Sequence, residues 1–127
     1  MAMNKNKILI IEDNLIWREK YKKWLGDHYD YVDSADAINA AKTFDMHLPD
    51  LVILDLGLPE IDQGFELLDN IMAKNTDCAV IVITSSKDHK HALEAQQKGA
   101  SSYFFKGENI KEELPFLVRR AIKMQAL

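Results

Sequence analysis

The chain has a single cysteine, Cys78, no long apolar run and no excess of basic residues. One cysteine excludes a disulfide framework and fits a reducing compartment such as the cytoplasm. The formal net charge of −4 offers no basic surface for nucleic acid. The first apolar run, residues 8–11, stops at Glu12, which predicts a strand rather than a signal peptide or a membrane span.

Gly-rich nucleotide loops, low-complexity tracts and internal repeats are also missing from the sequence. The 127 residues, of which 47% are apolar and 28% charged, are typical of one globular domain. Residues 1–6 are predicted to be a tail, whose Met-Ala-Met start is typical of a cloning remnant, and residues 7–127 the folded domain. No output segment follows the last predicted helix, which leaves two alternatives: a single-domain protein and a piece of a longer one.

Short apolar runs alternate with amphipathic segments along the chain. Strands are predicted over residues 8–11, 29–32, 51–54, 78–83 and 103–105. Helices are predicted over residues 15–26, 36–48, 65–72 and 88–98, followed by a last helix with Pro115 in its first turn. Residues 59–64 are predicted to be a loop. This alternation predicts an α/β fold: a single-domain, doubly wound (βα)5 flavodoxin-like arrangement with parallel strand order 2-1-3-4-5.

The strand over residues 51–54 is apolar throughout and ends on Asp55. So continuous a run is typical of a strand buried on both faces of a parallel sheet. Ligands of such sheets bind at the carboxyl ends of the strands, where Asp55 lies. Because aspartate is rarely buried without a partner, its position predicts a function.

Polar residues end three other predicted strands as well: Glu12 and Asp13, Thr84, and Lys106. In the expected strand order these ends are neighbours beside the switch point of the sheet. We therefore expect all of these side chains to converge with Asp55 on one crevice. The crevice would hold three carboxylates, one hydroxyl and one ammonium.

Three carboxylates in one crevice repel one another and favour a bound cation. All-oxygen ligands suit Mg²⁺, with Mn²⁺ as the alternative. Asp13 and Asp55 are the expected direct ligands, the carbonyl of Gly57 is a backbone ligand, and Glu12 acts from the outer shell or through water.

The remaining groups suit phosphoryl transfer onto a carboxylate. Lys106 would hold Asp55 before the reaction and a phosphoryl oxygen after it. Thr84 can donate its hydroxyl to a second phosphoryl oxygen. A nucleophile, a metal and donors for the phosphoryl oxygens are thus all predicted in one place.

On these residues the sequence resembles the receiver domain of two-component response regulators, the CheY-like family, from about Lys7 to Lys123. The acidic pair Glu12 and Asp13 and the later lysine, Lys106, match the family pattern in order and spacing. The resemblance implies that Asp55 is the phosphoacceptor and Thr84 the switch hydroxyl.

The resemblance also implies a regulatory mechanism. A sensor histidine kinase or a histidine phosphotransfer protein would phosphorylate Asp55, in a reaction that the domain itself catalyses and reverses without being a turnover enzyme. Thr84 would then move toward the phosphate, and Tyr103, at the aromatic switch position, would fill the vacated space. The face made by the fourth helix, fifth strand and last helix would control a downstream protein or a linked output domain, or form a homodimer. This domain would contact neither nucleic acid nor membrane.

One departure and several alternatives accompany this interpretation. The family usually has a proline after the lysine, where this chain has Gly107, so the loop is expected to be more mobile. A phosphate-independent pseudo-receiver is the main alternative. A haloacid-dehalogenase-type phosphatase needs a second aspartate at the position of Gly57. A flavodoxin relative needs a phosphate loop where Glu12 and Asp13 would repel phosphate.

Five further residues are predicted to play no part in the site. Trp17 and Trp24 lie on the apolar face of the first helix and are expected to serve packing. His89 and His91 are two residues apart, do not share a helical face and are expected to be solvated, as is Cys78. Each candidate site residue also has a structural alternative, as a helix cap, a surface charge or a core aromatic.

Overall fold

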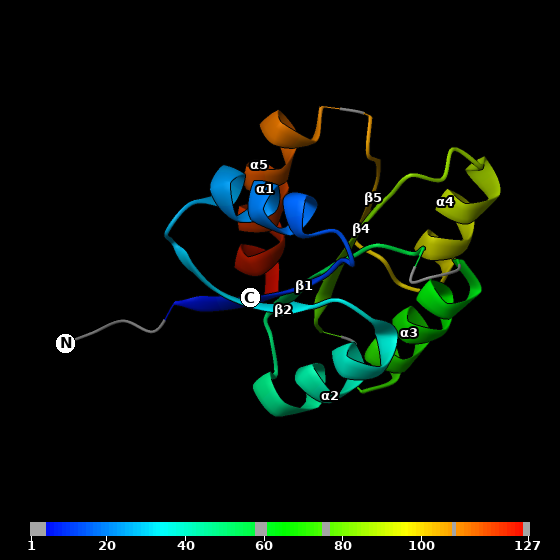
Figure 1. The fold of residues 1–127 in the computed structure, drawn as a ribbon, viewed down its shortest axis with the longest axis horizontal. Coiled ribbons are helices and arrows are strands. Elements are labelled where there is room, and N and C mark those ends of the chain that lie inside the picture. The colour runs from blue at the N-terminus through cyan, green and yellow to red at the C-terminus, as the bar shows by residue number, and fades with distance from the viewer. Residues whose placement is uncertain (1–4, 58–60, 75–76, 108, 126–127) are drawn as a thin grey trace.

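The structure, a computed structural model, describes residues 5–57, 61–74, 77–107 and 109–125. Strands and helices alternate from β1 to α5 (Figure 1). The strands are β1 (Asn6–Ile11), β2 (Tyr29–Ser34), β3 (Leu51–Leu54), β4 (Ala79–Thr84) and β5 (Ser102–Phe105). The helices are α1 (Leu15–Leu25), α2 (Ala37–His47), α3 (Ile61–Lys74), α4 (His89–Gln97) and α5 (Ile110–Gln125).

The strands form one parallel sheet in the order β2-β1-β3-β4-β5. Helices α1 and α5 cover one face of this sheet, while α2, α3 and α4 cover the other (Figure 1). The predicted fold class and strand order are therefore confirmed. β1 begins at Asn6, one residue before the predicted start of the domain.

Apolar side chains that alternate along each strand build a core on either face of the sheet. In β3, Val52 and Leu54 join the core beneath α2 and α3, whereas Leu51 and Ile53 join the core beneath α1 and α5. All residues of β3 and β4 are buried. This burial on both faces explains why these two strands are apolar without interruption.

Side chains and backbone geometry fix the ends of the first two helices. Asn14 caps α1 by accepting a hydrogen bond from the N–H of Trp17, and Asp36 caps α2. Gly26 ends α1 with a φ of +82°, which glycine adopts without steric cost. Leu48 ends α2 in the left-handed region with a φ of +47°, where a side chain is unfavourable.

The predicted loop over residues 59–64 is wrong for its described part, because α3 already begins at Ile61. Residues 58–60 lie outside the described part of the chain. Gly64, the last residue of the predicted loop, is buried inside α3 against the backbone of Leu56. A Cβ at Gly64 would lie 2.0 Å from the carbonyl oxygen of Leu56. Because glycine has no Cβ, it allows the helix and the loop to approach this closely.

The predicted start of the last helix is also wrong. α5 begins at Ile110, and Pro115 lies in its second turn rather than its first. Ile110, Leu114 and Val118 are spaced by four residues and are all buried in the core beneath α1 and α5. The stabilisation from burying this stripe outweighs the cost of the backbone hydrogen bond that the proline removes from the helix.

Cys78 was expected to be solvated but is buried directly before β4, with 4% of its surface exposed. Burial raises the pKa of its thiol to about 12. Within the described residues, no helix combines the length and the apolar character that crossing a membrane requires.

Candidate functional site

The candidate site lies at the carboxyl edge of the sheet. Glu12 follows β1, Asp55 follows β3, Thr84 ends β4 and Lys106 follows β5. Hydrogen bonds of the sheet continue to these positions, from the N–H of Asp55 to the carbonyl of Ile11 at 3.0 Å and from that of Lys106 to the carbonyl of Thr84 at 2.9 Å. The parallel ladder thus brings residues that are far apart in sequence to one edge, as predicted.

Three carboxylates gather there. Glu12, Asp13 and Asp55 each offer a carboxylate oxygen within 4.8 Å of the other two. Glu12 is fully buried and Asp55 is 7% exposed, whereas Asp13 is exposed. The cluster is therefore reached from solvent on the side of Asp13.

Lys106 supplies the positive charge that faces this cluster. Its Nζ lies 2.8 Å from Oε1 of Glu12 and 3.4 Å from Oδ2 of Asp55. Burial lowers the pKa of Lys106, but the contacts with Glu12 and Asp55 outweigh burial, and the net effect is a raised pKa. Lys106 is consequently charged at neutral pH.

Burial raises the pKa of Glu12 to about 7, with a contribution from the neighbouring charge of Asp55 and opposition from Lys106. One ammonium thus faces three carboxyl groups, so acidic groups outnumber the basic group in the site, and ionisation of Glu12 increases the excess of negative charge. A divalent cation with oxygen ligands would balance this charge, and Mg²⁺ suits the donor set.

The residues present therefore fit the expected metal ion. Asp13 and Asp55 would hold it directly, and Glu12 would act from the outer shell. The loop after β3 curls back over Asp55, since the N–H of Gly57 donates to Oδ1 of Asp55 at 3.1 Å. The carbonyl of Gly57 stays a predicted ligand.

Thr84 and Tyr103 are connected through one residue, Ser86. The Thr84 side chain is buried, and its Oγ1 accepts a hydrogen bond from the N–H of Ser86 at 3.4 Å. The hydroxyl of Tyr103 donates to the carbonyl of Ser86 at 3.3 Å. Tyr103 thus lies beside the loop between β4 and α4 and outside the carboxylate cluster.

Two residues of α1 contact the site but were not predicted to do so. Trp17 was expected to serve packing only; its ring contacts Tyr21 and Trp24, yet Nζ of Lys106 also lies 5.1 Å from the Trp17 ring centroid. Arg18 donates from Nη1 to the carbonyl of Glu12 at 2.6 Å. The helical spacing of Trp17 indicated an apolar face, but no sequence signal pointed to Lys106.

His91 was expected to be solvated, and that prediction is wrong. Its Nδ1 and Oγ of Ser86 share a hydrogen bond of 2.5 Å. Its ring also meets the Phe65 ring edge-on, with centroids 5.9 Å apart. A lone histidine in a polar helix carries no sequence signal for either contact.

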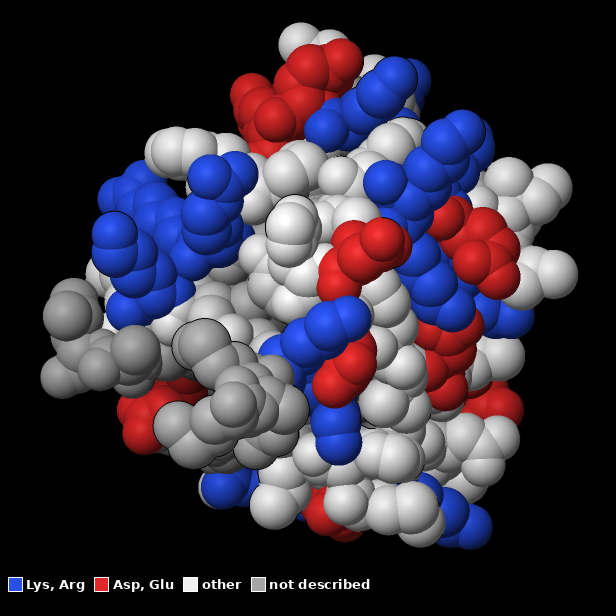
Figure 2. Space-filling model, turned by 90° about the vertical axis from the view of Figure 1, so that its left-hand side faces the viewer, with Lys and Arg blue, Asp and Glu red and all other residues white. Residues whose placement is uncertain are grey.

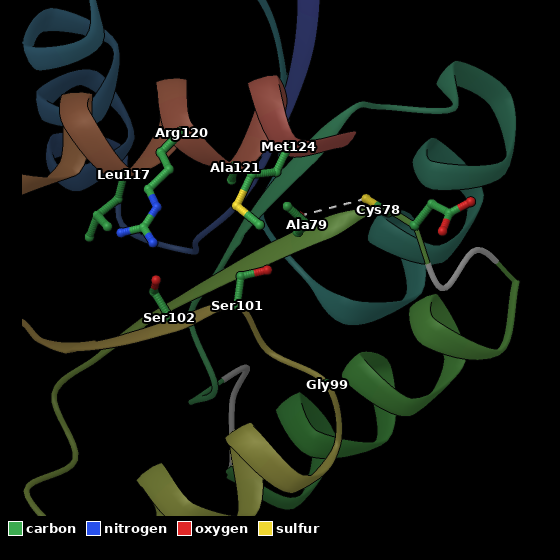
Figure 3. Close-up of a pocket in the computed structure, with 10 residues that line it drawn as sticks. Cys78, Ala79, Gly99, Ser101, Ser102, Leu117, Arg120, Ala121 and Met124 are labelled. Atoms are coloured by element: carbon green, nitrogen blue, oxygen red, sulfur yellow. Dashed lines mark hydrogen bonds between the residues drawn. The ribbon is translucent and has the colours of Figure 1, made fainter. Parts of the chain in front are cut away.

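A pocket among the described residues lies away from this cluster, at the opposite edge of the sheet. Figure 3 shows Leu117, Arg120 and Met124 reaching from α5 toward Ser101 and Ser102. This open groove has a volume of about 750 Å³, and none of the candidate site residues line it. The predicted chemistry therefore does not depend on this groove.

On the face drawn in Figure 2, neither sign of charge covers the surface: Lys and Arg side chains gather on its left side and lie among Asp and Glu on its right.

A family model for the response regulator receiver domain matches residues 8–115. The chain belongs to this family. The resemblance inferred from the sequence is thereby confirmed. Receiver domains of response regulators act in two-component signalling rather than as turnover enzymes.

Curated relatives include the virulence transcriptional regulatory protein PhoP of Salmonella typhimurium, which is 34% identical over 122 residues. The alignment covers 95% of this chain and 51% of that relative. The transcriptional regulatory protein PhoP of Escherichia coli is 32% identical with the same coverage. The chain thus spans about half the length of these receiver relatives.

Solved receiver structures have the same fold. A two-component response regulator of the LuxR family from Aurantimonas sp. SI85-9A1 matches with a TM-score of 0.83 and 27% identity, covering 94% of this chain and 86% of that one. A CheY-like receiver domain protein from Methanospirillum hungatei JF-1 matches with a TM-score of 0.88 and 21% identity, covering 97% and 98%. The second match supports the fold alone.

Proposed function

We propose that this receiver accepts a phosphoryl group on Asp55 from the phosphohistidine of a sensor histidine kinase or a histidine phosphotransfer protein, with Mg²⁺ bound. The observation that carries the proposal is the position of Asp55 at the carboxyl edge of the sheet. There its carboxylate lies 3.4 Å from Nζ of Lys106 and within 4.8 Å of carboxylate oxygens of Glu12 and Asp13.

In the proposed reaction an oxygen of Asp55 attacks the phosphorus atom of the phosphohistidine. A phosphorus–oxygen bond forms as the phosphorus–nitrogen bond breaks, and the electron pair of the broken bond returns to the imidazole of the donor. Bound Mg²⁺ would neutralise part of the charge shared by the carboxylates and the phosphoryl group. Asp13, Asp55 and the Gly57 carbonyl would bind it, with Glu12 in the outer shell and Mn²⁺ as a substitute.

Lys106 and Thr84 complete the proposed reaction centre. Lys106 contacts Asp55 directly. The same ammonium group can therefore move its contact to a phosphoryl oxygen as negative charge develops on that oxygen. Thr84 already accepts a hydrogen bond from the N–H of Ser86, which leaves its hydroxyl proton available to another phosphoryl oxygen. By the same chemistry the domain would catalyse its own phosphorylation and dephosphorylation.

Phosphorylation is proposed to alter the face that α4, β5 and α5 share, through the contacts of Thr84 and Tyr103. The partner of that face would be a downstream protein, a covalently linked output domain or a second copy of the chain. The PhoP relatives are named as transcriptional regulatory proteins and are about twice as long, which supports a linked output domain. We take residues 7–127 as the receiver unit and, because its one cysteine is free, place it in the cytoplasm.

The test is the intact mass of the protein after incubation with acetyl phosphate or phosphoramidate, with and without Mg²⁺. We expect a gain of one phosphoryl group that requires both Mg²⁺ and Asp55. Asp55→Asn should not gain mass, whereas Asp30→Asn, which changes an exposed carboxylate in β2, should behave like the wild type. A wild-type protein that binds Mg²⁺ but gains no phosphoryl group would favour the phosphate-independent pseudo-receiver.

A further inference from the structure

Ser86 is a junction between the end of β4, the β5 strand and α4. Its N–H donates to Oγ1 of Thr84 at 3.4 Å, and its carbonyl accepts from the hydroxyl of Tyr103 at 3.3 Å. Its own Oγ accepts from the N–H of Asp88, the N-cap of α4, at 3.3 Å and shares a 2.5 Å hydrogen bond with Nδ1 of His91. A movement of Ser86 would therefore alter its contacts with the end of β4, with the Tyr103 side chain and with α4.

His91 is fixed on two sides. One side is the hydrogen bond to Ser86, and the other is the edge-on contact with Phe65 of α3. Phe65 is 5% exposed and belongs to the core beneath α2 and α3. His91 thus connects the loop after β4 to a side chain that does not move without disturbing the core.

Elsewhere α4 is held weakly. Ala95 is its one buried residue, and Leu93 is 56% exposed. An open groove of about 340 Å³ runs between α4 and β5, lined by Leu93, Gln96 and Tyr103 among others. The ion pair of Lys98 with Asp69 of α3, at 2.7 Å, holds the far end of the helix. The first turns of α4 are consequently held by the Ser86–His91 hydrogen bond, the contact of His91 with Phe65 and the N-cap Asp88.

From these contacts we infer that His91 is a positioning residue that couples α4 to the state of Asp55 through Ser86. The inference rests on the proposed function and adds to it the side chain through which α4 responds. When the hydroxyl of Thr84 turns to a phosphoryl oxygen, the N–H of Ser86 follows Oγ1 or loses its acceptor. His91 then transmits the movement of Ser86 to α4, which repacks at low cost because little of it is buried.

The experiment uses beryllofluoride with Mg²⁺ as a stable probe of the phosphorylated state. Loading of the site is followed by Trp17 fluorescence, because the Trp17 ring lies against Lys106. The response of α4 is followed separately, as the change in the amide NMR signals of residues 89–97. Asp55→Asn is the negative control, in which neither the Trp17 fluorescence nor the α4 amide signals should change.

His91→Phe keeps an aromatic ring against Phe65 and removes Nδ1. We expect site loading to stay within about two-fold of the wild type, while the α4 response falls about five-fold, the loss that one hydrogen bond typically causes. His91→Asn, which restores a hydrogen-bonding atom, should recover the response. His89→Phe is the matched control, since His89 is exposed on the same helix, and should leave both signals unchanged.

Ser86→Ala gives an independent version of the test that leaves the His91 ring in place. It retains the carbonyl that accepts from Tyr103 and should reduce the α4 response as His91→Phe does. An undiminished α4 response in both variants, or a wild-type α4 that does not respond while Trp17 reports loading, would overturn the inference. A wild-type protein whose Trp17 signal does not change would instead contradict the proposed function on which the inference rests.

Discussion

The ring of Phe105 occupies the space in which a side chain at Gly107 would begin. A Cβ on Gly107 would lie 2.6 Å from Cε1 and 3.2 Å from Cδ1 of Phe105. Nζ of Lys87 lies 5.1 Å from the centroid of the same ring. A proline after Lys106, as is usual in the family, would therefore require the Phe105 ring to move from its present position.

This relationship predicts that Gly107→Pro has opposite effects in two backgrounds. In the wild type, displacement of Phe105 should cost about 1–3 kcal/mol, more than the roughly 0.4–1 kcal/mol gained by restricting the unfolded chain. In Phe105→Val the contact is removed, and Gly107→Pro should become neutral or stabilising. Urea unfolding of the two single variants and the double variant measures the interaction. Equal effects of Gly107→Pro in both backgrounds would show that Phe105 is not the obstacle.

Gly64 makes the closest approach between α3 and the loop that carries Asp55. A Cβ at Gly64 would lie 2.0 Å from the Leu56 carbonyl oxygen and 2.4 Å from its Cα, and backbone atoms cannot move aside as a side chain can. We expect Gly64→Ala to destabilise the protein by at least about 2 kcal/mol. Since Leu56 adjoins Asp55, phosphorylation from acetyl phosphate should also slow in the protein that remains folded.

Gly57→Ala is the matched control for this prediction. Gly57 lies in the same loop, and a Cβ there would meet Oδ1 of Asp55 at 3.8 Å, an ordinary contact. The backbone carbonyl of residue 57 is retained, so Mg²⁺ binding should persist. Thermal unfolding and Mg²⁺ titration of both variants provide the comparison. A Gly64→Ala protein as stable as Gly57→Ala would contradict the tight packing of α3 on the loop.

The sequence was sufficient to predict the fold and the convergence of the candidate side chains because both depend on local patterns. The uninterrupted apolar runs of β3 and β4 follow directly from burial on two faces. Asp55, directly after such a run, must lie at a strand end whatever the details of packing. The strand order then brings the acidic and basic strand ends together.

The remaining features depend on contacts between distant segments, which no local pattern specifies. Gly64 was predicted to lie in a loop and Pro115 in the first turn of the last helix, but a close backbone approach in one case and a buried apolar stripe in the other decided where these helices begin. The contact of His91 with Ser86 likewise requires the position of α4 relative to the loop. Such effects of tertiary packing are invisible to helical periodicity and capping rules.

Leu48 carries a backbone conformation that its side chain disfavours. Its φ of +47° places it in the left-handed region, and its side chain is 73% exposed. The left-handed conformation costs an L-residue roughly 1–2 kcal/mol, a cost that glycine avoids. Glycine in turn loses more conformational entropy on folding, which costs roughly 0.5–1 kcal/mol. Leu48→Gly should therefore stabilise the protein by about 0.5 kcal/mol in urea unfolding. Leu48→Ala is the control, and a similar gain from it would attribute the effect to loss of the exposed side chain.

Glu12 should make the metal-free protein less stable as pH rises toward neutrality. Its pKa is about 7 in the folded protein against 4.5 ordinarily, so between these values the folded state binds more protons than the unfolded state. Stability should therefore fall through this window, by on the order of 1–3 kcal/mol. The contribution of Lys106, whose pKa is raised above 10.5, is complete below that value and does not alter the slope. Urea unfolding in EDTA across this range, with Glu12→Gln alongside, tests the assignment: the variant should lose the slope, and an unchanged slope would place the titrating group elsewhere.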